Sequence, residues 1–554
     1  MRVSVKKWFK DGDPWVWINA GAVAISMVMV FGLLALIASR GLVHFWANDV
    51  MQAEVEAKNG NKYTIIGELV ETVETPAAQL KDAGYDITTD AEYLDRNLIK
   101  IGNRDITGAD FRWVLDQHIE NRRFPEEIIV MERREWGNFY GFLKQVKEKG
   151  EVVAEGDAAW PALEERLERV LDFYDEIHYI EKTEIGAINA GIERIRLEER
   201  GLELEDRLTS QAKADFASSR AALDAEYAVL QKQLIELYTQ INRDQVLVES
   251  MDGTQITVDL AKVVHAYRPN AMSLGDKLIF YVAKLYEFVS DEPREANTEG
   301  GIFPAIFGTV LMVIIMSIIV TPFGVVAAVY LREYATQGPL TRIIRIAVNN
   351  LAGVPSIVYG VFGLGFFIYF VGSGIDQAFF PEALPSPTFG TGGLLWASIT
   401  LAILTLPVVI VATEEGLSRI PRSIREGSLA LGATKAETLW RVILPMASPA
   451  MMTGVILAIA RAAGEVAPLM LVGVVKLAPS LPLDGNYPYL HLDQKFMHLG
   501  FHIYDVGFQS PNVEAARPLV YATSLLLVAV IALLNLSAVS IRNRLREKYK
   551  SLEM

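Results

Sequence analysis

The stretch FPAIFGTVLMVIIMSIIVTPFGVVAAVY, residues 303–330, contains no charged side chain and is long enough to cross a bilayer as a helix. Five more apolar runs of similar length occur in the 554-residue chain. The six runs cover about residues 16–39, 303–330, 346–372, 393–413, 446–475 and 517–540. Since a transmembrane helix needs roughly 20 apolar residues, the sequence predicts an all-α polytopic membrane protein with six transmembrane helices.

The first run follows three basic residues, Lys6, Lys7 and Lys10, as the apolar part of a signal peptide would. Its length of about 24 residues exceeds that of a signal peptide, whose apolar region has about 7–15 residues. The segment ALIASRGL also lacks the small-residue pattern of a cleavage site. We therefore expect residues 1–40 to form a short N-terminal segment and a retained first helix.

Charge divides the chain into two parts. Residues 41–300 carry a net charge of about −21, and because the whole chain carries −15, the remaining residues carry about +6. Basic residues gather before the first run, between the second and third, between the fourth and fifth, and after the sixth. Short positive loops stay in the cytoplasm, so both termini are expected there, in a bacterial inner membrane. The insert, residues 41–300, is then expected to be periplasmic.

The insert combines two kinds of sequence. Residues 52–150 alternate short β-rich segments with turns, which predicts an α+β fold. Residues 160–245 place apolar side chains three and four apart, which predicts a helical hairpin or short coiled coil. Three glycines are expected to interrupt its helices: Gly186, Gly191 and Gly201. A β-hairpin is expected around Asp252–Gly253. The insert is either a solvated spacer or a scaffold for a periplasmic partner.

The segment EEGLSRIPRSIREGSLALGATKAETLWRVILP, residues 414–445, contains two possible helix starts. Ser423 with Glu426 and Thr434 with Glu437 both match the capping box, in which two side chains satisfy free backbone N–H groups. Gly432 lies between them and can adopt the left-handed conformation that ends a helix. The pattern predicts two short helices joined by a sharp turn at the membrane surface. Four apolar residues would be exposed there unless a partner or the membrane interface covers them: Leu429, Leu431, Leu439 and Trp440.

This segment resembles the EAA loop of ABC-importer permeases, in which Glu and two small residues precede a Gly and an Ile-x-Leu-Pro ending. The matching residues here are Glu426, Gly427, Ser428, Gly432, Leu444 and Pro445. The segment departs from the family pattern by a Gly-Ser pair in place of two alanines and by Val442 in place of Ile. In that family the loop docks in a groove of a separate ATPase subunit. The sequence contains no G-x-x-x-x-G-K-[ST] phosphate loop, so the resemblance implies a transporter subunit and not an enzyme.

Two further stretches narrow the resemblance. NNLAGVPSIVYGVFGLG (349–365) and RAAGEVAPL (461–469) are similar to the permease subunits of phosphate importers, and the GE-x-APL ending favours the PstA type over the PstC type. The resemblance covers the first helix and residues 301–545, followed by a tail at 546–554. It implies the type I permease fold of ABC importers. It does not extend to the insert, which is far longer than the first external loop usual in that family.

The resemblance implies half of a translocation pathway for inorganic phosphate. The implied partners are a PstC-type second permease, a dimeric PstB-type ATPase, an external PstS-type phosphate-binding protein and membrane lipid, with no nucleic acid and no cofactor. Another oxyanion, such as molybdate, tungstate or sulfate, stays open as the substrate because the binding protein sets most of the specificity. A homodimer also stays open. A membrane sensor or scaffold is the alternative class, and the EAA-like loop disfavours it.

Arg461 and Glu465 lie in the fifth apolar run. An ionised side chain at that depth costs about 2.5–3.5 kcal/mol. The two residues are four apart and would share one helix face. Intramembrane charges usually face a bundle interior or an aqueous cavity, and Arg binds phosphate with paired donors. We expect Arg461 to meet the passing anion and Glu465 to hold Arg461, with a purely structural ion pair as the alternative.

The third run contains a second group of candidate pathway residues. Pro355 breaks the hydrogen-bond ladder of a helix there, and Gly353 lets it bend. Three residues supply polar groups: Asn350, Ser356 and Tyr359. Freed backbone groups at membrane depth are tolerated only in protein or beside a watery cavity. The stretch is therefore a pathway element or a kink packed against neighbouring helices.

Three histidines, His491, His498 and His502, are close enough in sequence to suggest a metal site with Asp493 or Asp505. Their spacing is unspecific, so we expect a surface loop and assign no metal. The chain has no cysteine, which excludes disulfides, thiol nucleophiles and iron–sulfur clusters.

Overall fold

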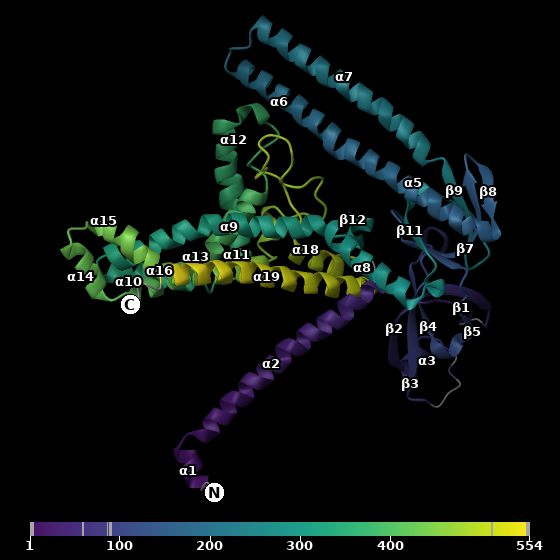
Figure 1. Cartoon of the computed structure of the whole chain (residues 1–554), viewed down its shortest axis with the longest axis horizontal. Coiled ribbons are helices and arrows are strands. Elements are labelled where there is room, and N and C mark those ends of the chain that lie inside the picture. Colours follow the sequence, from purple (N-terminus) through teal and green to yellow (C-terminus); the bar gives the residue numbers. More distant parts are fainter. Residues whose placement is uncertain (1–4, 58–59, 86, 88–90, 511–512, 550–554) are drawn as a thin grey trace.

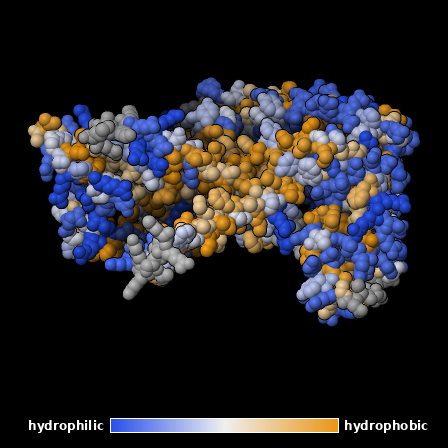
Figure 2. All heavy atoms as spheres, turned by 60° about the horizontal axis from the view of Figure 1, so that its bottom comes forward, coloured by the Kyte–Doolittle hydropathy of each residue, from blue (hydrophilic) through white to orange (hydrophobic). Residues whose placement is uncertain are grey.

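The computed structural model describes residues 5–57, 60–85, 87, 91–510 and 513–549. In that part of the chain, six helices are long and apolar enough to span a membrane, which confirms the number predicted. Figure 1 shows these helices with the insert folded at one end. Figure 2 shows an apolar band between two hydrophilic ends. We call the end that carries the insert the insert side, and the end that carries the EAA-like loop the tail side.

The spans are Asp13–Phe45, Phe303–Tyr334, Ser356–Phe379, Leu394–Ser418, Lys435–Ala463 and Ala516–Glu547. They are formed by the helices α2 (Asp13–Leu42), α9 (Phe303–Val329), α11 (Ser356–Phe362), α12 (Ser373–Phe379), α13 (Leu394–Ser418), α15 (Lys435–Thr438), α16 (Leu444–Ala463) and α19 (Val513–Tyr549), the last of which extends beyond its span at both ends. Five shorter helices flank them: α1 (Val5–Lys10), α10 (Pro339–Leu351), α14 (Arg422–Ala430), α17 (Leu469–Val472) and α18 (Leu499–Tyr504).

Two spans have a boundary that differs from the one their apolar run predicted. The third span begins at Ser356 and not near 346, because α10 ends at Leu351 and a separate helix starts after Pro355. The fifth ends at Ala463 and not near 475. In both places a proline follows within five residues of the helix end, and proline removes a backbone donor and disfavours helical geometry in the residue before it. Apolar residues continue on both sides of each break, so the length of the run alone does not locate it.

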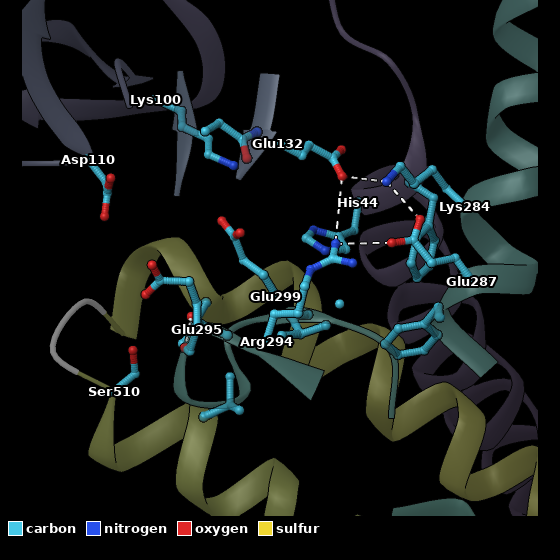
Figure 3. A pocket seen from close by; sticks show the side chains of 18 of the residues that line it. His44, Lys100, Asp110, Glu132, Lys284, Glu287, Arg294, Glu295, Glu299 and Ser510 are labelled. Carbon is cyan, nitrogen blue, oxygen red and sulfur yellow. Dashed lines mark hydrogen bonds and ion pairs between the residues drawn. The ribbon is translucent and has the colours of Figure 1, made fainter. Parts of the chain in front are cut away.

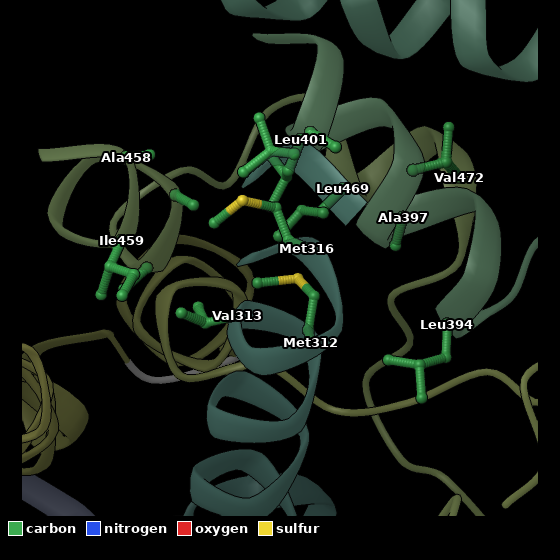
Figure 4. Packing of buried hydrophobic residues seen from close by; sticks show 14 of the residues in the cluster. Met312, Val313, Met316, Leu394, Ala397, Leu401, Ala458, Ile459, Leu469 and Val472 are labelled. Carbon is green, nitrogen blue, oxygen red and sulfur yellow. The ribbon is translucent and has the colours of Figure 1, made fainter. Parts of the chain in front are cut away.

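The bundle core lies between α9, α13 and α16. Buried side chains from these three helices and from α17 interlock there, including Met312, Met316, Leu401, Ile459 and Leu469 (Figure 4). Small residues bring the helices together. A Cβ atom on Gly454 would lie 2.7 Å from Cβ of Ala412, so α16 and α13 touch through their backbones. Close approach of this kind is typical of membrane helices, which pack through small residues.

The first span stands apart from this bundle. Figure 1 shows α2 leaving the other helices at an angle, and its most apolar 18-residue window has no buried residue. Its last turn is an exception: a Cβ on Gly41 would lie 2.7 Å from the backbone nitrogen of Ala522 in α19. The first span is therefore fixed to the rest of the chain at the insert side only.

In the described residues of the insert, the strands form two large antiparallel sheets and a small two-stranded sheet of β12 (Pro293–Arg294) and β13 (Glu299–Gly300). The first has the strand order β4-β3-β2-β1-β5, and the second has the order β10-β9-β7-β6-β11 with β8 paired to β7. The strands are β1 (Val50–Glu56), β2 (Lys62–Pro76), β3 (Tyr93–Lys100), β4 (Phe111–Leu115), β5 (Ile119–Arg123), β6 (Ile128–Arg133), β7 (Asn138–Glu148), β8 (Glu151–Glu155), β9 (Asp244–Glu249), β10 (Gln255–Asp259) and β11 (Val263–Tyr267). The β-hairpin expected around Asp252–Gly253 is confirmed: β9 pairs with β10 across a turn in which Gly253 has φ +81°.

The helices of the insert are α3 (Ala77–Asp82), α4 (Arg104–Thr107), α5 (Ala159–Tyr179), α6 (Ile185–Leu204), α7 (Ser210–Ile241) and α8 (Leu274–Ser290). A π turn joins α5 to α6, and α7 returns alongside α6. The expectation that Gly186, Gly191 and Gly201 interrupt the helices is wrong, since all three lie inside α6. Gly191 faces α7 instead: a Cβ there would lie 3.1 Å from Leu223.

Two contacts place the α6–α7 hairpin over loops of the permease helices. α6 contacts residues 381–383, which follow the third span, and the guanidinium of Arg194 lies 6.0 Å from the ring centre of Tyr487. At the base of the hairpin, Lys182 pairs with Glu292. The hairpin therefore extends from the second sheet across the loops at one face of the bundle (Figure 1).

Candidate coupling loop and intramembrane polar site

The EAA-like loop is built from α14 and α15 with a sharp turn between them. Gly432 has φ +90°, the left-handed conformation that was predicted. Thr434 forms the predicted capping box: its side chain accepts from the N–H of Glu437, whose carboxylate accepts from the N–H of Thr434. The other predicted box is wrong. Helix α14 begins at Arg422 after Pro421, which places Ser423 inside the helix, where its side chain makes no cap.

The loop is anchored to the end of the second span. The guanidinium of Arg425 donates to Glu333 at 2.9 Å and to the carbonyls of Leu417 and Ile420. The ammonium of Lys435 donates to the carbonyl of Glu333. These charge-assisted bonds hold α14 and α15 in one orientation relative to the helices.

The outer surface of the loop exposes large apolar side chains among charged ones. Leu431 is 90% exposed and Trp440 is 74% exposed, and Leu429 is also exposed. Leu439, which was expected beside them, is buried in a cluster with Leu417 and Ile443. Large apolar side chains at this exposure mark an interaction surface. The surface includes the predicted coupling residues Glu426 and Gly427, which are exposed, with Ser428 half-buried on the same helix.

The remaining coupling residues lie where the loop joins the fifth span. Leu444 and Pro445 are the first two residues of α16 and are half-buried. Ser428 reaches the same region, since its hydroxyl lies 2.9 Å from that of Thr438. The loop is thus connected directly to α16, a 20-residue helix that ends at Ala463.

Arg461 and Glu465 form the expected ion pair, with Nε of Arg461 3.7 Å from Oε1 of Glu465. They do not share a helix face, contrary to the expectation. Arg461 is in the last turn of α16, whereas Glu465 follows the C-cap Gly464 in a turn that leads to Pro468. Both side chains are partly accessible, at 34% and 21%. The pair therefore lies at a break in the membrane-spanning chain.

The polar residues of the third span lie at the second break. Tyr359 is buried in α11, and its hydroxyl donates to the carbonyl of Leu351 at 2.6 Å, which bridges the gap between α10 and α11. Ser356 begins α11 and is half-buried, while Asn350 and Pro355 are exposed. The polar atoms of this break are thus partly satisfied by Tyr359 and partly open.

The two breaks lie against each other. A Cβ on Gly360, the residue after Tyr359, would lie 2.7 Å from Cα of Pro468, so α11 touches the turn that carries Glu465. The structure thus brings together the two stretches that sequence reasoning singled out separately. Such a cluster of polar groups among apolar helices can bind or guide a charged solute.

The histidine expectation is wrong for two of the three residues. His498 and His502 are 1% and 2% exposed, and burial lowers the pKa of their imidazoles to about 3 and about 4. They are neutral core residues of the segment that precedes the last span. His491 is half-buried and pairs with Asp484 at 2.9 Å.

A polar cavity of about 290 Å³, which no sequence pattern indicated, lies between the insert and the bundle (Figure 3). An ion-pair network borders it: the ammonium of Lys284 lies 2.5 Å from Glu132 and 2.7 Å from Glu287, and Arg294 lies 3.0 Å from Glu287. Although burial raises the pKa of Glu132, the charge of Lys284 and of His265 lowers it overall. Carboxylates and imidazole of Glu132, His265 and Glu287 converge as metal ligands would, but Lys284 already bridges the two carboxylates.

Comparison by sequence identifies a family and relatives of this chain. The family model described as "Binding-protein-dependent transport system inner membrane component" matches residues 320–551. The phosphate transport system permease protein PstA 1 of Mycobacterium tuberculosis is 36% identical over 247 residues, covering 44% of this chain and 71% of the relative. The probable phosphate transport system permease protein PstA of Methanocaldococcus jannaschii is 29% identical over 257 residues, covering 46% and 79%. One solved chain, from the MetNI methionine ABC transporter in an inward-facing conformation, aligns with 44% of this chain and 94% of its own, with 18% identity and a TM-score of 0.32.

The fold, the loop and these relatives define the class: the chain belongs to the inner-membrane permeases of binding-protein-dependent transport systems. Within that class it is of the PstA type. The matched family region, residues 320–551, lies outside the insert.

Gly432→Val is expected to leave the protein in the membrane and to abolish solute uptake by the transporter that contains it. A β-branched residue in the left-handed conformation costs about 1–3 kcal/mol, which displaces the turn between α14 and α15. Uptake by cells that depend on this permease measures the effect. Gly338→Ala is the matched control, because Gly338 lies on the same side of the bundle with extended backbone and open space around it. Unchanged uptake with Gly432→Val would exclude the turn from coupling.

Proposed function

We propose that the chain forms half of the translocation pathway of an ABC importer for inorganic phosphate. The observation that carries the proposal is the Arg461–Glu465 ion pair at the break after α16, packed beside the break before α11. A charged pair within the bundle costs free energy of desolvation, so a function there accounts for it better than packing does. The names of the relatives from Mycobacterium tuberculosis and Methanocaldococcus jannaschii support phosphate as the solute.

Arg461 is the residue that meets the anion in this proposal. Its Nε faces Glu465, and no described residue accepts a hydrogen bond from its two Nη groups. A guanidinium with free Nη donors can bind two phosphate oxygens in parallel. Glu465 holds Arg461 at rest and repels the anion once it has passed. Asn350, Ser356 and Tyr359 supply polar groups at the adjoining break, and Pro355 creates that break.

Coupling to ATP hydrolysis occurs through the EAA-like loop. A separate ATPase subunit binds the exposed surface around Glu426, Gly427 and Leu431, and movement of the loop is transmitted to α16 through Leu444 and Pro445. A 20-residue helix is about 30 Å long, so α16 connects the loop directly with Arg461 at its other end. The fixed orientation of the loop, set by Arg425 and Glu333, supports this transmission.

The orientation follows from the charge of the loops. The tail side, which carries the EAA-like loop and the C-terminal end of α19, faces the cytoplasm, and the insert faces the periplasm. The N-terminus is then cytoplasmic as well. The α6–α7 hairpin extends over the loops at residues 381–383 and Tyr487, where an external phosphate-binding protein would deliver its solute. We infer that the hairpin contributes to the docking surface for that protein. The second permease is of the PstC type, and the ATPase is a dimer.

Another oxyanion is the second candidate solute, because a guanidinium binds molybdate, tungstate or sulfate with the same donors. The intact complex, isolated through a tagged copy of this chain, identifies the partners and separates a heterodimer from a homodimer. Uptake of labelled phosphate, sulfate and molybdate by the same strain then decides the solute. A membrane sensor would show no uptake that depends on this chain.

Arg461→Gln is expected to abolish phosphate uptake while the complex still assembles and retains its basal ATPase activity. The change keeps a polar side chain of similar length but removes the charge and the paired donors. Arg461→Lys is expected to restore uptake only in part, because an ammonium keeps the charge without the planar geometry. Labelled phosphate uptake and membrane levels are measured together. Uptake at the parent rate with Arg461→Gln would remove Arg461 from the pathway, and loss of the protein from the membrane would make the pair structural.

The orientation can be tested with single cysteines, because the chain has none of its own. Val229→Cys on α7 and Leu431→Cys on the EAA-like loop place thiols at exposed positions on the two sides. A membrane-impermeant maleimide added to intact spheroplasts is expected to label position 229 only, and to label both positions after lysis. Labelling of position 431 alone in intact spheroplasts would reverse the orientation.

Shortening the hairpin tests its role in docking. Residues 191 and 223 face each other across α6 and α7, so residues 192–222 can be replaced by a short flexible loop without changing the pairing below them. The binding protein is expected to associate more weakly with the shortened complex, while the second permease and the ATPase still copurify. Arg194→Ala, which removes only the contact with Tyr487, is the milder companion variant. Unchanged association with the binding protein would make the hairpin a spacer.

A further inference from the structure

Helix α8 has one face that is fully occupied by the rest of the protein. Lys277 is buried and pairs with Asp49 at 2.5 Å. Phe280 packs on Tyr267 in the second sheet, with ring centres 4.6 Å apart. Phe288 packs on Phe45, the last residue of the first span, at 4.9 Å. This inner face joins the insert to the end of the first span.

The opposite face of α8 is apolar and uncovered. From residue 278 to the end of the helix, the exposed residues include no charged side chain. They are Leu278, Ile279, Val282, Ala283, Tyr286 and Val289. Ile279, Val282 and Tyr286 are 72%, 64% and 71% exposed. A contiguous apolar surface of this kind is rare on a protein that faces only water.

The position of α8 explains what covers this face. Its last turn lies where two spans meet the insert, because Phe288 contacts Phe45 and its carbonyl accepts from the N–H of Ile302, just before α9. Figure 1 shows α8 running across the direction of α2 at the end of that helix. Trp46 and Tyr281 lie 6.0 Å apart at the same place, and aromatic side chains are enriched where a membrane meets water.

We propose that α8 is an interfacial membrane helix whose outer face is immersed in the lipid at the insert side of the bilayer. An amphipathic helix that lies in the plane of the interface buries its apolar face about 5–10 Å into the boundary between headgroups and acyl chains. Here the last turn of α8 lies beside the ends of two spans, and the other face carries Lys284 and Glu287 to the ion pairs of the insert. The lipid surface thereby fixes the insert relative to the membrane. The proposal depends on the membrane location of the spans and not on the solute.

Site-directed spin labelling tests the proposal on the full chain, which needs no removal of native cysteines. Ile279→Cys, Val282→Cys and Tyr286→Cys are labelled with a nitroxide and measured in lipid nanodiscs containing phosphatidylethanolamine and phosphatidylglycerol. Collision rates with oxygen, which concentrates in lipid, and with a water-soluble nickel chelate are compared. Val229→Cys on α7 is the aqueous control, and Ile318→Cys in α9 is the control within a span; both residues are 67% exposed.

The oxygen-to-nickel collision ratio at the three α8 positions is expected to lie severalfold above that at position 229 and below that at position 318. A ratio equal to that at 229 would place α8 in water and overturn the proposal. Protection from both oxygen and nickel would also overturn it, because a protein surface, such as a second permease, would then cover the helix. Thermal unfolding of each labelled variant in the same nanodiscs, compared with the unlabelled parent, identifies any variant that has lost its fold. If a variant has lost its fold, Ala283→Cys, a smaller change on the same face of α8, is labelled and measured in its place.

Discussion

Every backbone N–H and C=O group inside the hydrocarbon needs a partner, and this requirement decides where membrane helices can break. In the described residues, two such breaks adjoin the spans of the permease: one precedes the third span, between Leu351 and Ser356, and one follows the fifth, between Ala463 and Leu469. In each break a local turn satisfies some of the free backbone groups: the N–H of Gly353 donates to the carbonyl of Asn350, and the N–H of Glu465 donates to the carbonyl of Ala462. The breaks then pack on each other where α11 meets Pro468. Polar backbone is thus concentrated at one point of an apolar bundle, and the Arg461–Glu465 pair lies at that point.

Apolar content predicted the number of spans correctly because length and composition are sufficient for that purpose. It did not locate the two breaks, because the apolar runs continue past both. The first was predicted from Pro355, which lacks a backbone N–H, whereas the end of α16 at Ala463 was not predicted. Sequence motifs for helix caps are limited in a similar way, because they do not by themselves locate the start of a helix. Thr434 caps its helix because Gly432 has already turned the chain, whereas Ser423 lies one residue inside a helix that begins after Pro421. A local motif predicts a helix start only where the preceding residues leave the helix free to begin there.

Other features depend on contacts between residues far apart in the chain, so no local pattern could reveal them. Gly191 continues its helix because Leu223 of the returning helix occupies the space beside it. The N–H of Leu499 donates to the hydroxyl of Thr309 in α9, which holds the start of α18 in the core and buries His498 and His502 there. The candidate pathway residues were found from their chemistry alone. Only the structure shows that the two stretches contact each other at Gly360 and Pro468.

The base of the insert and its α6–α7 hairpin are held by ion pairs that differ in strength. Between β6 and α8, Lys284, Glu132 and Glu287 are at most 15% exposed, and breaking a buried pair of this kind costs about 3–5 kcal/mol. Along the hairpin, Lys182 and Glu292 are 42% and 50% exposed, and exposed pairs contribute about 0–1 kcal/mol. The contact of Arg194 with the exposed ring of Tyr487 contributes about 0.5–1 kcal/mol. If the loops at residues 381–383 and Tyr487 move during transport, the hairpin contacts therefore separate first. The insert then stays with the ends of α2 and α9 while the hairpin separates from the loops.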